Sequence, residues 1–202
     1  MERGDERPHA ARRVLEAAIE AIDAGGEHAV RVQDIADQAK VQVPILYRHF
    51  VNRDGLIQAA QLERISRQVD TELRDLAAAI ETVGTIEQFR TVVDVILAAL
   101  DTLERRTSRW QRINVIGSSY GRPPLAAEVA KLQARAVRGI AEALRGPQEN
   151  GWLRDGLDLD AFSAWFAGQT LGRILIELGD SDVDDSAWNS ISHNAVRHTL
   201  LG

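Results

Sequence analysis

Cysteine is absent from this 202-residue sequence, which excludes disulfide bonds, thiolate metal sites and cysteine nucleophiles. No apolar run approaches the roughly 20 residues that a membrane-spanning helix needs. The charged opening segment, MERGDERPHAARR, lacks the apolar stretch of a secretory signal. We therefore expect a cytoplasmic protein, in a reducing compartment, that has no membrane partner.

Catalytic and nucleotide-binding motifs are missing as well. The sequence has no P-loop, no glycine-rich dinucleotide turn, no HExxH and no GxSxG. His193 and His198 are five residues apart, so on a helix they point in different directions and cannot hold one metal ion from a single face. The sequence thus favours a protein that is not an enzyme and has no cofactor or metal site, although an all-α enzyme stays as an alternative.

Helical periodicity is the dominant pattern that is present. Apolar residues recur every three or four positions along nearly the whole chain, and no segment alternates over the length of a strand. Glycine and proline interrupt the pattern at intervals, as at Gly84 and Gly146-Pro147, which should kink or end a helix. We predict an all-α fold of about nine helices, the last two at about 158–179 and 184–201.

The first three predicted helices are short and the later ones are long, which indicates a domain boundary near residue 53. We therefore predict an N-terminal domain of residues 1–53 and a larger helical domain of residues 54–202. Asn52 is suited to cap the first long helix, and the segment from Thr85 to Gln88 has the pattern of a capping box.

One stretch has an unusual charge for an acidic protein with a net charge of −6. Between Asp37 and Asp54 there is no carboxylate, whereas Lys40, Arg48 and Arg53 fall inside it. Two short helices flank a turn here, as in a helix-turn-helix, whose second helix reads the DNA major groove. The alternative is that the aromatic residues are ordinary core and the basic ones a solvated face.

The segment VQDIADQAKVQVPILYRHFVNRDGLI resembles the signature of tetracycline-repressor-type (TetR family) transcriptional regulators. The motif occupies residues 31–50, and the similarity is close over residues 10–60. The positions that match the signature are Ile35-Ala36, Val41, Leu46 to Phe50, Arg53 and Leu56. Beyond this region the similarity is one of layout alone.

The resemblance implies a homodimeric repressor that binds a near-palindromic double-stranded DNA operator. It also implies that the larger domain serves dimerisation and binds a small molecule that releases the DNA. By position, Gln33 would face bases or phosphates, and Arg48 could do either. The residues expected to face base edges are Gln42, Val43, Pro44 and Ile45, and those expected to hold phosphates are Tyr47, His49 and Arg53.

Two positions depart from the family pattern. Lys40 stands where the family usually has glycine, and a positive φ at a residue with a side chain costs about 1 kcal/mol. Arg31-Val32 opens the helix before the turn without the usual hydroxyl cap. The local geometry of the motif, and the phosphate contact made from that cap, therefore depend on these two positions.

The predicted helix at 158–179 combines small residues on one face with bulky apolar residues elsewhere. Small residues allow a second helix to approach closely, so we predict a dimer interface there, against the alternative of a central helix in a monomer. Its predicted members are Ala164, Gly168, Gly172 and Leu175. On the same helix, Arg173 and Glu177 are spaced like a pair on a helix surface or at a dimer crossing.

Aromatic residues with few polar neighbours indicate a pocket for a mainly apolar or aromatic small molecule. The candidate pocket residues are Phe89, Trp110, Asn114, Trp165, Phe166 and Gln169. Core packing is the alternative for each of them singly. A row of arginines at positions 105, 106, 109 and 112 is typical of a solvated or salt-bridging face, with an anionic ligand as the alternative. A ligand-binding helical dimer without a DNA function is the other reading of the whole chain.

Overall fold

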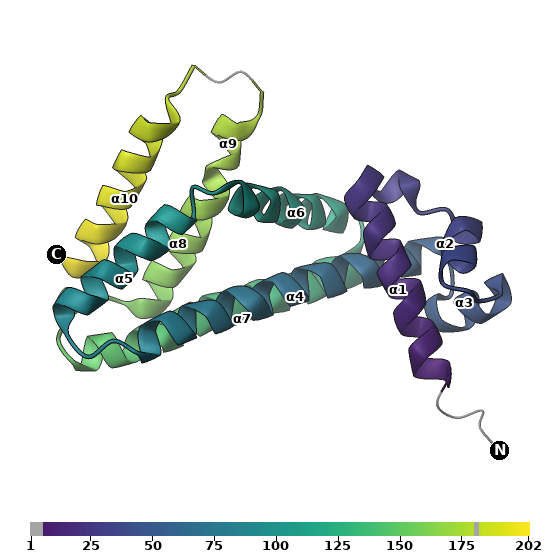
Figure 1. The fold of residues 1–202 in the computed structure, drawn as a ribbon, viewed down its shortest axis with the longest axis horizontal. Coiled ribbons are helices and arrows are strands. Elements are labelled where there is room, and N and C mark those ends of the chain that lie inside the picture. The colour runs from purple at the N-terminus through teal and green to yellow at the C-terminus, as the bar shows by residue number, and fades with distance from the viewer. Residues whose placement is uncertain (1–5, 180–181) are drawn as a thin grey trace. The chain divides into compact units, whose positions relative to one another are not determined.

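The computed structural model describes residues 6–179 and 182–202, and these ranges form helices and turns without a strand (Figure 1). The predicted all-α class is confirmed. None of the helices in these ranges is long and apolar enough to cross a membrane. In chain order the elements are α1 (Glu6–Gly25), the 3-10 helix η1 (Glu27–Ala29), α2 (Val32–Gln38), α3 (Val43–Phe50), α4 (Arg53–Glu81), α5 (Ile86–Ala99), α6 (Leu103–Ser119), α7 (Pro123–Glu149), α8 (Leu159–Gly172), α9 (Ile174–Glu177) and α10 (Asp185–Leu201).

The chain divides into two compact units, an N-terminal unit up to Arg67 and a C-terminal unit from Gln68 onward. Helix α4 begins in the first unit and ends in the second.

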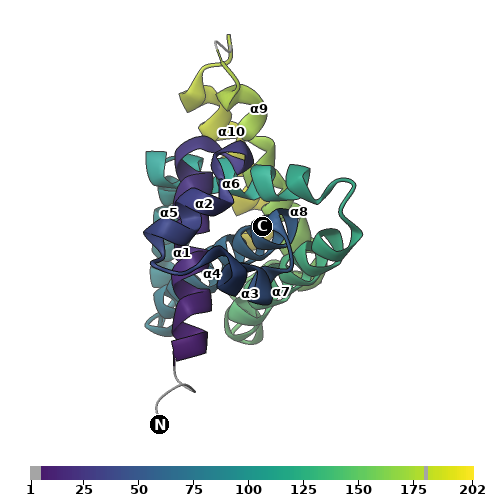
Figure 2. The same ribbon diagram turned by 90° about the vertical axis from the view of Figure 1, so that its right-hand side faces the viewer.

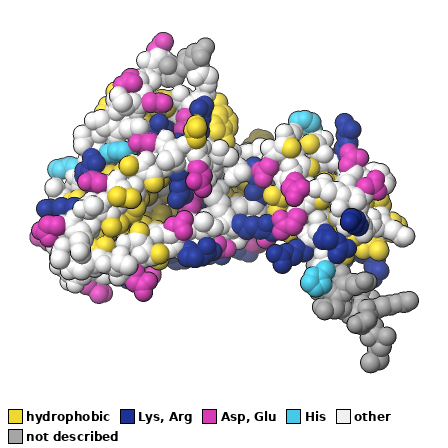
Figure 3. Space-filling view, viewed as in Figure 1, with side chains coloured by type: hydrophobic (Ala, Val, Ile, Leu, Met, Phe, Trp, Pro, Cys, Tyr) yellow, Lys and Arg dark blue, Asp and Glu magenta, His cyan; other side chains and the backbone are white. Residues whose placement is uncertain are grey.

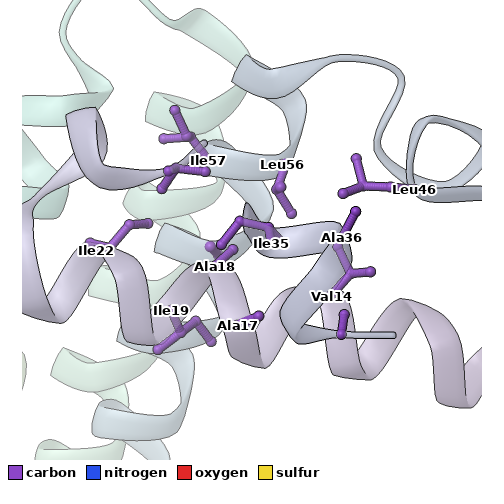
Figure 4. Packing of buried hydrophobic residues seen from close by; sticks show 13 residues of the cluster. Val14, Ala17, Ala18, Ile19, Ile22, Ile35, Ala36, Leu46, Leu56 and Ile57 are labelled. Atoms are coloured by element: carbon purple, nitrogen blue, oxygen red, sulfur yellow. The ribbon is translucent and has the colours of Figure 1, made fainter. Parts of the chain in front are cut away.

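The N-terminal unit is built around a small aliphatic core. Helix α1 presents one apolar stripe, and short helices α2 and α3 together with the first turns of α4 close over it (Figure 4). Val14, Ile35, Leu46 and Leu56 have at most 1% of their surface exposed. Because alanines occupy many of the remaining core positions, the helices approach one another closely.

Side-chain caps begin several helices at the predicted places. The Asn52 side chain accepts a hydrogen bond from the Gly55 amide at 2.7 Å, so Asn52 caps α4 as expected. Thr85 caps α5 by accepting from the Gln88 amide at 3.3 Å. The Gln88 side chain accepts from the Gly84 amide at 2.8 Å, one residue before the position of a standard capping box.

The C-terminal unit packs α7 against α8, with α6 and α10 also in contact with α8. Figures 1 and 2 show α7 beside the second half of α4, where Arg135 and Asp70 form an ion pair at 2.6 Å. The largest apolar cluster of this unit joins α5, α7, α8 and α10. Its fully buried centre is Phe89, against which Trp152 packs with the two rings tilted by 35° and their centroids 5.9 Å apart.

Two helix boundaries differ from the sequence-based expectation. The helix expected over 158–179 is interrupted at Arg173 and divides into α8 and α9. The Arg173 side chain is buried there among charged partners, next to Gly172. Helix α7 continues through Pro147 to Glu149, although the proline has no N–H to donate back along the helix, and its C-cap is Asn150, three residues after the proline.

Candidate nucleic-acid interface and internal cavity

The turn between α2 and α3 is a Schellman motif. The Val41 amide donates to the Ala36 carbonyl at 2.9 Å, and the Lys40 amide donates to the Asp37 carbonyl at 3.1 Å. Lys40 lies in the left-handed region with φ of 54°, the position that glycine favours. The backbone strain expected at this departure is therefore present. The lysine lies just before the start of α3.

Helix α2 is held by contacts other than a cap at its start. Arg31 precedes it in an extended conformation and makes no side-chain cap, as the sequence predicted. At its other end, the Arg13 Nε of α1 donates to the Ala39 carbonyl at 2.9 Å, which anchors the turn. Sequence reasoning missed Arg13, because nothing local to the motif marks it. Gln33 is exposed, and its amide donates to Asp37 at 3.1 Å.

Helix α3 turns one apolar side inward and leaves the rest exposed. Leu46 is fully buried, and Val43 and Phe50 are partly buried against the same core. The predicted DNA-contacting residues on the outer side are Gln42, Pro44, Ile45, Tyr47, Arg48 and His49, all of them exposed. Pro44 lies in the first turn of α3, as predicted, where its missing N–H breaks no helical hydrogen bond.

The exposed side of α3 is basic and free of acid. Within the described ranges, the side chains of Lys40, Tyr47 and Arg48 make no hydrogen bond or ion pair. Lys/Arg and Asp/Glu side chains are interspersed over the surface of the N-terminal unit (Figure 3). Local potential at α3 is therefore set by these few residues, within the roughly 8–10 Å over which charge acts in salt.

The link from α3 to α4 is a strained tight turn. Val51 has φ of 59° and ψ of −53°, and the Asn52 amide donates to the Phe50 carbonyl at 2.6 Å. These values are typical of a classic γ-turn, which is rare and strained for a β-branched residue. Gly55 follows because a Cβ there would meet the Phe50 carbonyl oxygen at 2.3 Å. The turn fixes where α3 ends relative to α4.

Arg53 is engaged inside the N-terminal unit. Its Nε donates to the Val30 carbonyl at 2.7 Å, and its Nη2 donates to the Glu27 carbonyl at 2.5 Å. These bonds tie the start of α4 to the segment between α1 and α2. The phosphate contact predicted for Arg53 would have to use the nitrogen that remains, so this geometry favours a positioning role.

A second arginine links α1 to α4 at the surface of the same unit. Arg67 donates to both oxygens of Glu16, at 2.8 and 2.5 Å, and also pairs with Glu63 at 2.7 Å. The hydrogen bond from Arg67 lowers the pKa of Glu16 below its ordinary value of 4.5. The two carboxylates in turn raise the pKa of Arg67.

The C-terminal unit contains a cavity of about 280 Å³, a volume near the lower end for small-molecule sites. Its apolar wall comes from α4, α5, α7 and α8, with apolar side chains also visible at the surface around α5 (Figure 3). Its charged residues come from α4 and α6. These are Glu72, Asp75, Arg105, Arg109 and Arg112.

One predicted pocket residue, Phe166, lines this cavity. Phe166 and Phe89 line a second, smaller cavity of about 50 Å³. The other four predicted residues line neither. Trp110 and Asn114 are exposed on α6, Trp165 packs against Phe162, and Gln169 is half-buried. The apolar character of the pocket was predictable, whereas its position between α4 and α6 was not.

In the arginine row, Arg109 and Arg112 are buried, Arg105 is half-buried and Arg106 is exposed. Arg105, Arg109 and Arg112 form ion pairs, which fits a salt-bridging row and not a solvated one. The Arg173–Glu177 pair is buried, which corrects the expectation of a pair on the helix surface. Glu177 accepts hydrogen bonds from Arg109 of α6 and from Arg173, the latter at 3.2 Å. Arg173 also pairs with Asp101 at 3.2 Å and donates to Asn189. This cluster joins α6, α9 and α10, and its most buried carboxylate is that of Glu177.

The outer face of α8 is open in the single chain. Ala164 and Gly168 are exposed and Gly172 is half-buried, and a Cβ added at either glycine would meet nothing within 4 Å. Leu175 of α9 is 71% exposed, and Ile191 of α10 is 72% exposed. The residues predicted for the dimer interface therefore lie at an apolar surface that the described residues leave uncovered.

Comparison with known proteins gives consistent similarities. Residues 14–60 match the family model described as bacterial regulatory proteins, tetR family. The HTH-type transcriptional regulator UidR of Escherichia coli (strain K12) is 25% identical over 190 residues, which are 94% of this chain and 90% of that protein.

Solved structures share the fold over nearly the whole chain. A transcriptional regulator from Mesorhizobium loti, assigned to the TetR family, gives a TM-score of 0.73 at 15% identity and covers 97% of this chain and 98% of its own. A transcriptional regulator from Saccharomonospora viridis, solved with choline, gives a TM-score of 0.70 at 22% identity and covers 96% of this chain and 99% of its own.

Proposed function

We propose that this chain, which belongs to the tetR family of bacterial regulatory proteins, is a repressor that a small molecule releases from its operator. The observation that supports this best is the exposed, acid-free side of α3. It follows a fixed turn, and the side chains of Lys40, Tyr47 and Arg48 make no hydrogen bond or ion pair within the described ranges.

We propose that the first turn of α3 reads base edges. Gln42 offers an amide that can bond to adenine N6 and N7, and Ile45 offers an apolar contact for a thymine methyl group. Val43 is partly buried, so of the four predicted base-facing residues it has the least surface to offer.

Phosphate contacts are assigned to the residues around that turn. Tyr47, Arg48, His49 and Lys40 are exposed and can reach the DNA backbone on either side of the groove. Arg53 has a positioning role instead, because its hydrogen bonds to the Val30 and Glu27 carbonyls hold the start of α4 in place within the N-terminal unit. This division separates residues that touch DNA from one that orients them.

We propose that two chains pair through α8, α9 and α10. The open glycine positions and the exposed Leu175 and Ile191 fit a partner helix of a second copy. A two-fold dimer presents two α3 helices, which matches a near-palindromic operator with half-sites about one helical turn apart, or slightly more.

The effector is proposed to bind in the cavity of the C-terminal unit. The cavity is lined by α4, and α4 also supplies Leu56 and Ile57 to the N-terminal core. A ligand that favours one placement of α4 therefore changes DNA affinity by its difference in affinity for the two states. The regulator solved with choline supports a small-molecule site in this fold.

The test begins with selection of duplexes from a random pool by the full-length protein. We expect a near-palindromic site bound by two chains. Arg48→Ala should weaken binding to all duplexes and lower the salt-dependence slope by about one unit, whereas Gln42→Ala should relax preference at particular base pairs by about 1–3 kcal/mol. Tyr47→Phe should weaken binding without changing stability, because it removes only the hydroxyl.

Arg145→Ala is a matched control, because Arg145 is an exposed arginine of the C-terminal unit paired only with Glu142. It should bind every duplex like the wild type. Retention of no duplex by the folded wild-type protein would contradict the proposal and favour a ligand-binding dimer without a DNA function.

A further inference from the structure

The cavity of the C-terminal unit has charged residues from α4 and α6, and α4 also contributes to its apolar wall. Its apolar wall includes Val69, Leu73, Leu76, Ile96, Ile140 and Phe166. A volume of about 280 Å³ corresponds to about nine water molecules, so it suits a ligand of about ten non-hydrogen atoms. The apolar wall suits an aliphatic or aromatic ligand. The charged residues determine which polar group that ligand carries.

Two arginines among these charged residues share one carboxylate. Arg105 pairs with one oxygen of Glu72 at 3.0 Å, and Arg112 pairs with the other at 2.8 Å. The amide of Gln68 donates to the first oxygen at 2.9 Å. Only 10% of the Arg112 side chain is exposed, and 29% of Arg105, so solvent screens these two positive charges poorly.

Arg112 is incompletely satisfied by Glu72. Its Nε is buried and has no hydrogen-bond partner in the described part of the chain. A guanidinium binds a carboxylate most strongly through two parallel hydrogen bonds, and Arg112 uses one nitrogen on Glu72. A buried donor without a partner is costly, so this position favours a further acceptor.

Among the described residues, the other charged groups of the cavity do not supply an acceptor to the Arg112 Nε. Arg109 is itself a donor, and its hydrogen bonds go to Glu177 and to the Leu100 carbonyl, the latter at 2.7 Å. Asp75 is exposed at the rim, where water and salt screen its charge. The less exposed part of the charged side therefore has two arginines and one carboxylate, an excess of one positive charge.

We infer that the effector is an amphipathic anion whose carboxylate binds Arg105 and Arg112, with its apolar body in the rest of the cavity. Glu72 occupies the anion site in the absence of effector and is displaced from it on binding. The inference rests on the proposed function in one respect, since it takes this cavity to be the effector site.

Displacement of Glu72 has a consequence for α4. The Glu72 ion pairs are contacts between α4 and α6, so the effector exchanges a link within the protein for a link to itself. Because α4 also belongs to the N-terminal unit, this exchange gives the anion a route to DNA affinity that a neutral ligand of the same shape lacks.

The test uses two sets of matched probes with the full-length dimer and isothermal titration calorimetry. Octanoate, octanol and octylammonium form one set, and phenylbutyrate, phenylbutanol and phenylbutylammonium the other. In at least one set the carboxylate should bind about tenfold or more tightly than both matched compounds. The same carboxylate should release the selected operator in a fluorescence anisotropy assay.

Variants separate the anion site from general packing. Arg112→Gln and Arg105→Gln should each lower carboxylate affinity by about 10- to 100-fold and leave alcohol affinity unchanged. Glu72→Gln removes the internal competitor, so it should raise carboxylate affinity about tenfold. Arg145→Gln, at an exposed arginine outside the cavity, should change neither.

Several results overturn the inference. They are no binding by either carboxylate, equal affinity for carboxylate and alcohol, preference for ammonium, or weaker carboxylate binding to Glu72→Gln. If the operator is still bound in those cases, the proposed function stands and the anion site fails. If carboxylate binds as expected but no duplex is retained, the proposed function fails and the anion site stands.

Discussion

The two units of this protein use opposite kinds of interior. The N-terminal unit is filled with aliphatic side chains and alanine, and Gln61 is its one buried polar residue among those described. The C-terminal unit contains a cavity and buries Arg109, Arg112, Arg173 and Glu177. The first unit has the exposed Glu16–Arg67 pair and an Arg64–Asp23 pair in which only the arginine is mostly buried, whereas in the Arg109–Glu177 pair of the second unit both partners are buried.

This difference matches what each unit is proposed to do. A helix that reads DNA must be presented in one fixed position, and close packing around Leu46 and Gly55 provides this. A sensor must change between two states at small cost, which needs space for the ligand and contacts that it can replace. A cavity next to buried charges supplies both.

The largest effect should come from the buried charges of the C-terminal unit. Glu177→Gln leaves Arg109 and Arg173 without their shared carboxylate, so it should lower the free energy of unfolding by about 3–5 kcal/mol. All four tryptophans of the chain, at positions 110, 152, 165 and 188, lie in this unit. Urea unfolding followed by tryptophan fluorescence therefore measures this loss.

Glu142→Gln is the matched control, because Glu142 pairs with Arg145 on the exposed side of α7 in the same unit. It should change stability by less than about 0.5 kcal/mol. If Glu177→Gln were as mild as Glu142→Gln, the buried cluster would not stabilise this unit and the contrast between the two interiors would fail.

The second effect concerns the close packing of the N-terminal unit. Gly55→Ala should destabilise this unit by about 1–3 kcal/mol, because the new Cβ meets the Phe50 carbonyl at 2.3 Å and the turn must shift. Hydrogen exchange of the α3 and α4 amides should show the loss locally. Operator binding should weaken as α3 moves, while tryptophan fluorescence stays unchanged.

Gly117→Ala is the corresponding change in the other unit, since a Cβ on this α6 residue meets nothing within 4 Å. It should stabilise the C-terminal unit by about 0.5–1 kcal/mol through helix propensity. Equal effects of the two substitutions, in sign and size, would argue that packing is no tighter at Gly55 than on an open helix face.

The same contrast explains which features the sequence predicted. The helix-turn-helix, the Asn52 cap and the positive φ at Lys40 depend on neighbours within a few residues, so local patterns were enough. The hydrogen bonds of Arg53 to the Val30 and Glu27 carbonyls could not be predicted in this way, because these acceptors are more than twenty residues earlier in the chain. A basic residue at a conventional motif position gives no sign of such a partner.

The burial of Arg109, Arg112 and Arg173 could not be predicted from the sequence for a similar reason. Arg109 and Glu177 are 68 positions apart, and periodicity alone reads a row of arginines as a solvated or salt-bridging face without identifying the partners. The interruption of the helix at Arg173 lies at the same cluster, and no local pattern in the sequence marks it.

The smallest effect should come from the exposed ion pair of the N-terminal unit. Glu16→Gln should cost no more than about 1 kcal/mol at neutral pH, because both Glu16 and Arg67 are over a third exposed. Since Arg67 holds the pKa of Glu16 below 4.5 in the folded protein, the contribution is complete above that value. It should disappear as the pH falls through the lowered pKa and Glu16 is protonated.

Added salt should distinguish the exposed Glu16–Arg67 pair from the buried pairs of Glu177. Added sodium chloride should reduce the difference between wild type and Glu16→Gln, measured by urea unfolding with far-ultraviolet circular dichroism, because exposed charges are screened. The loss in Glu177→Gln should persist at the same salt concentration, since its partners are more than nine-tenths buried. A Glu16 effect that survived both high salt and low pH would mean that the N-terminal unit also relies on desolvated charge.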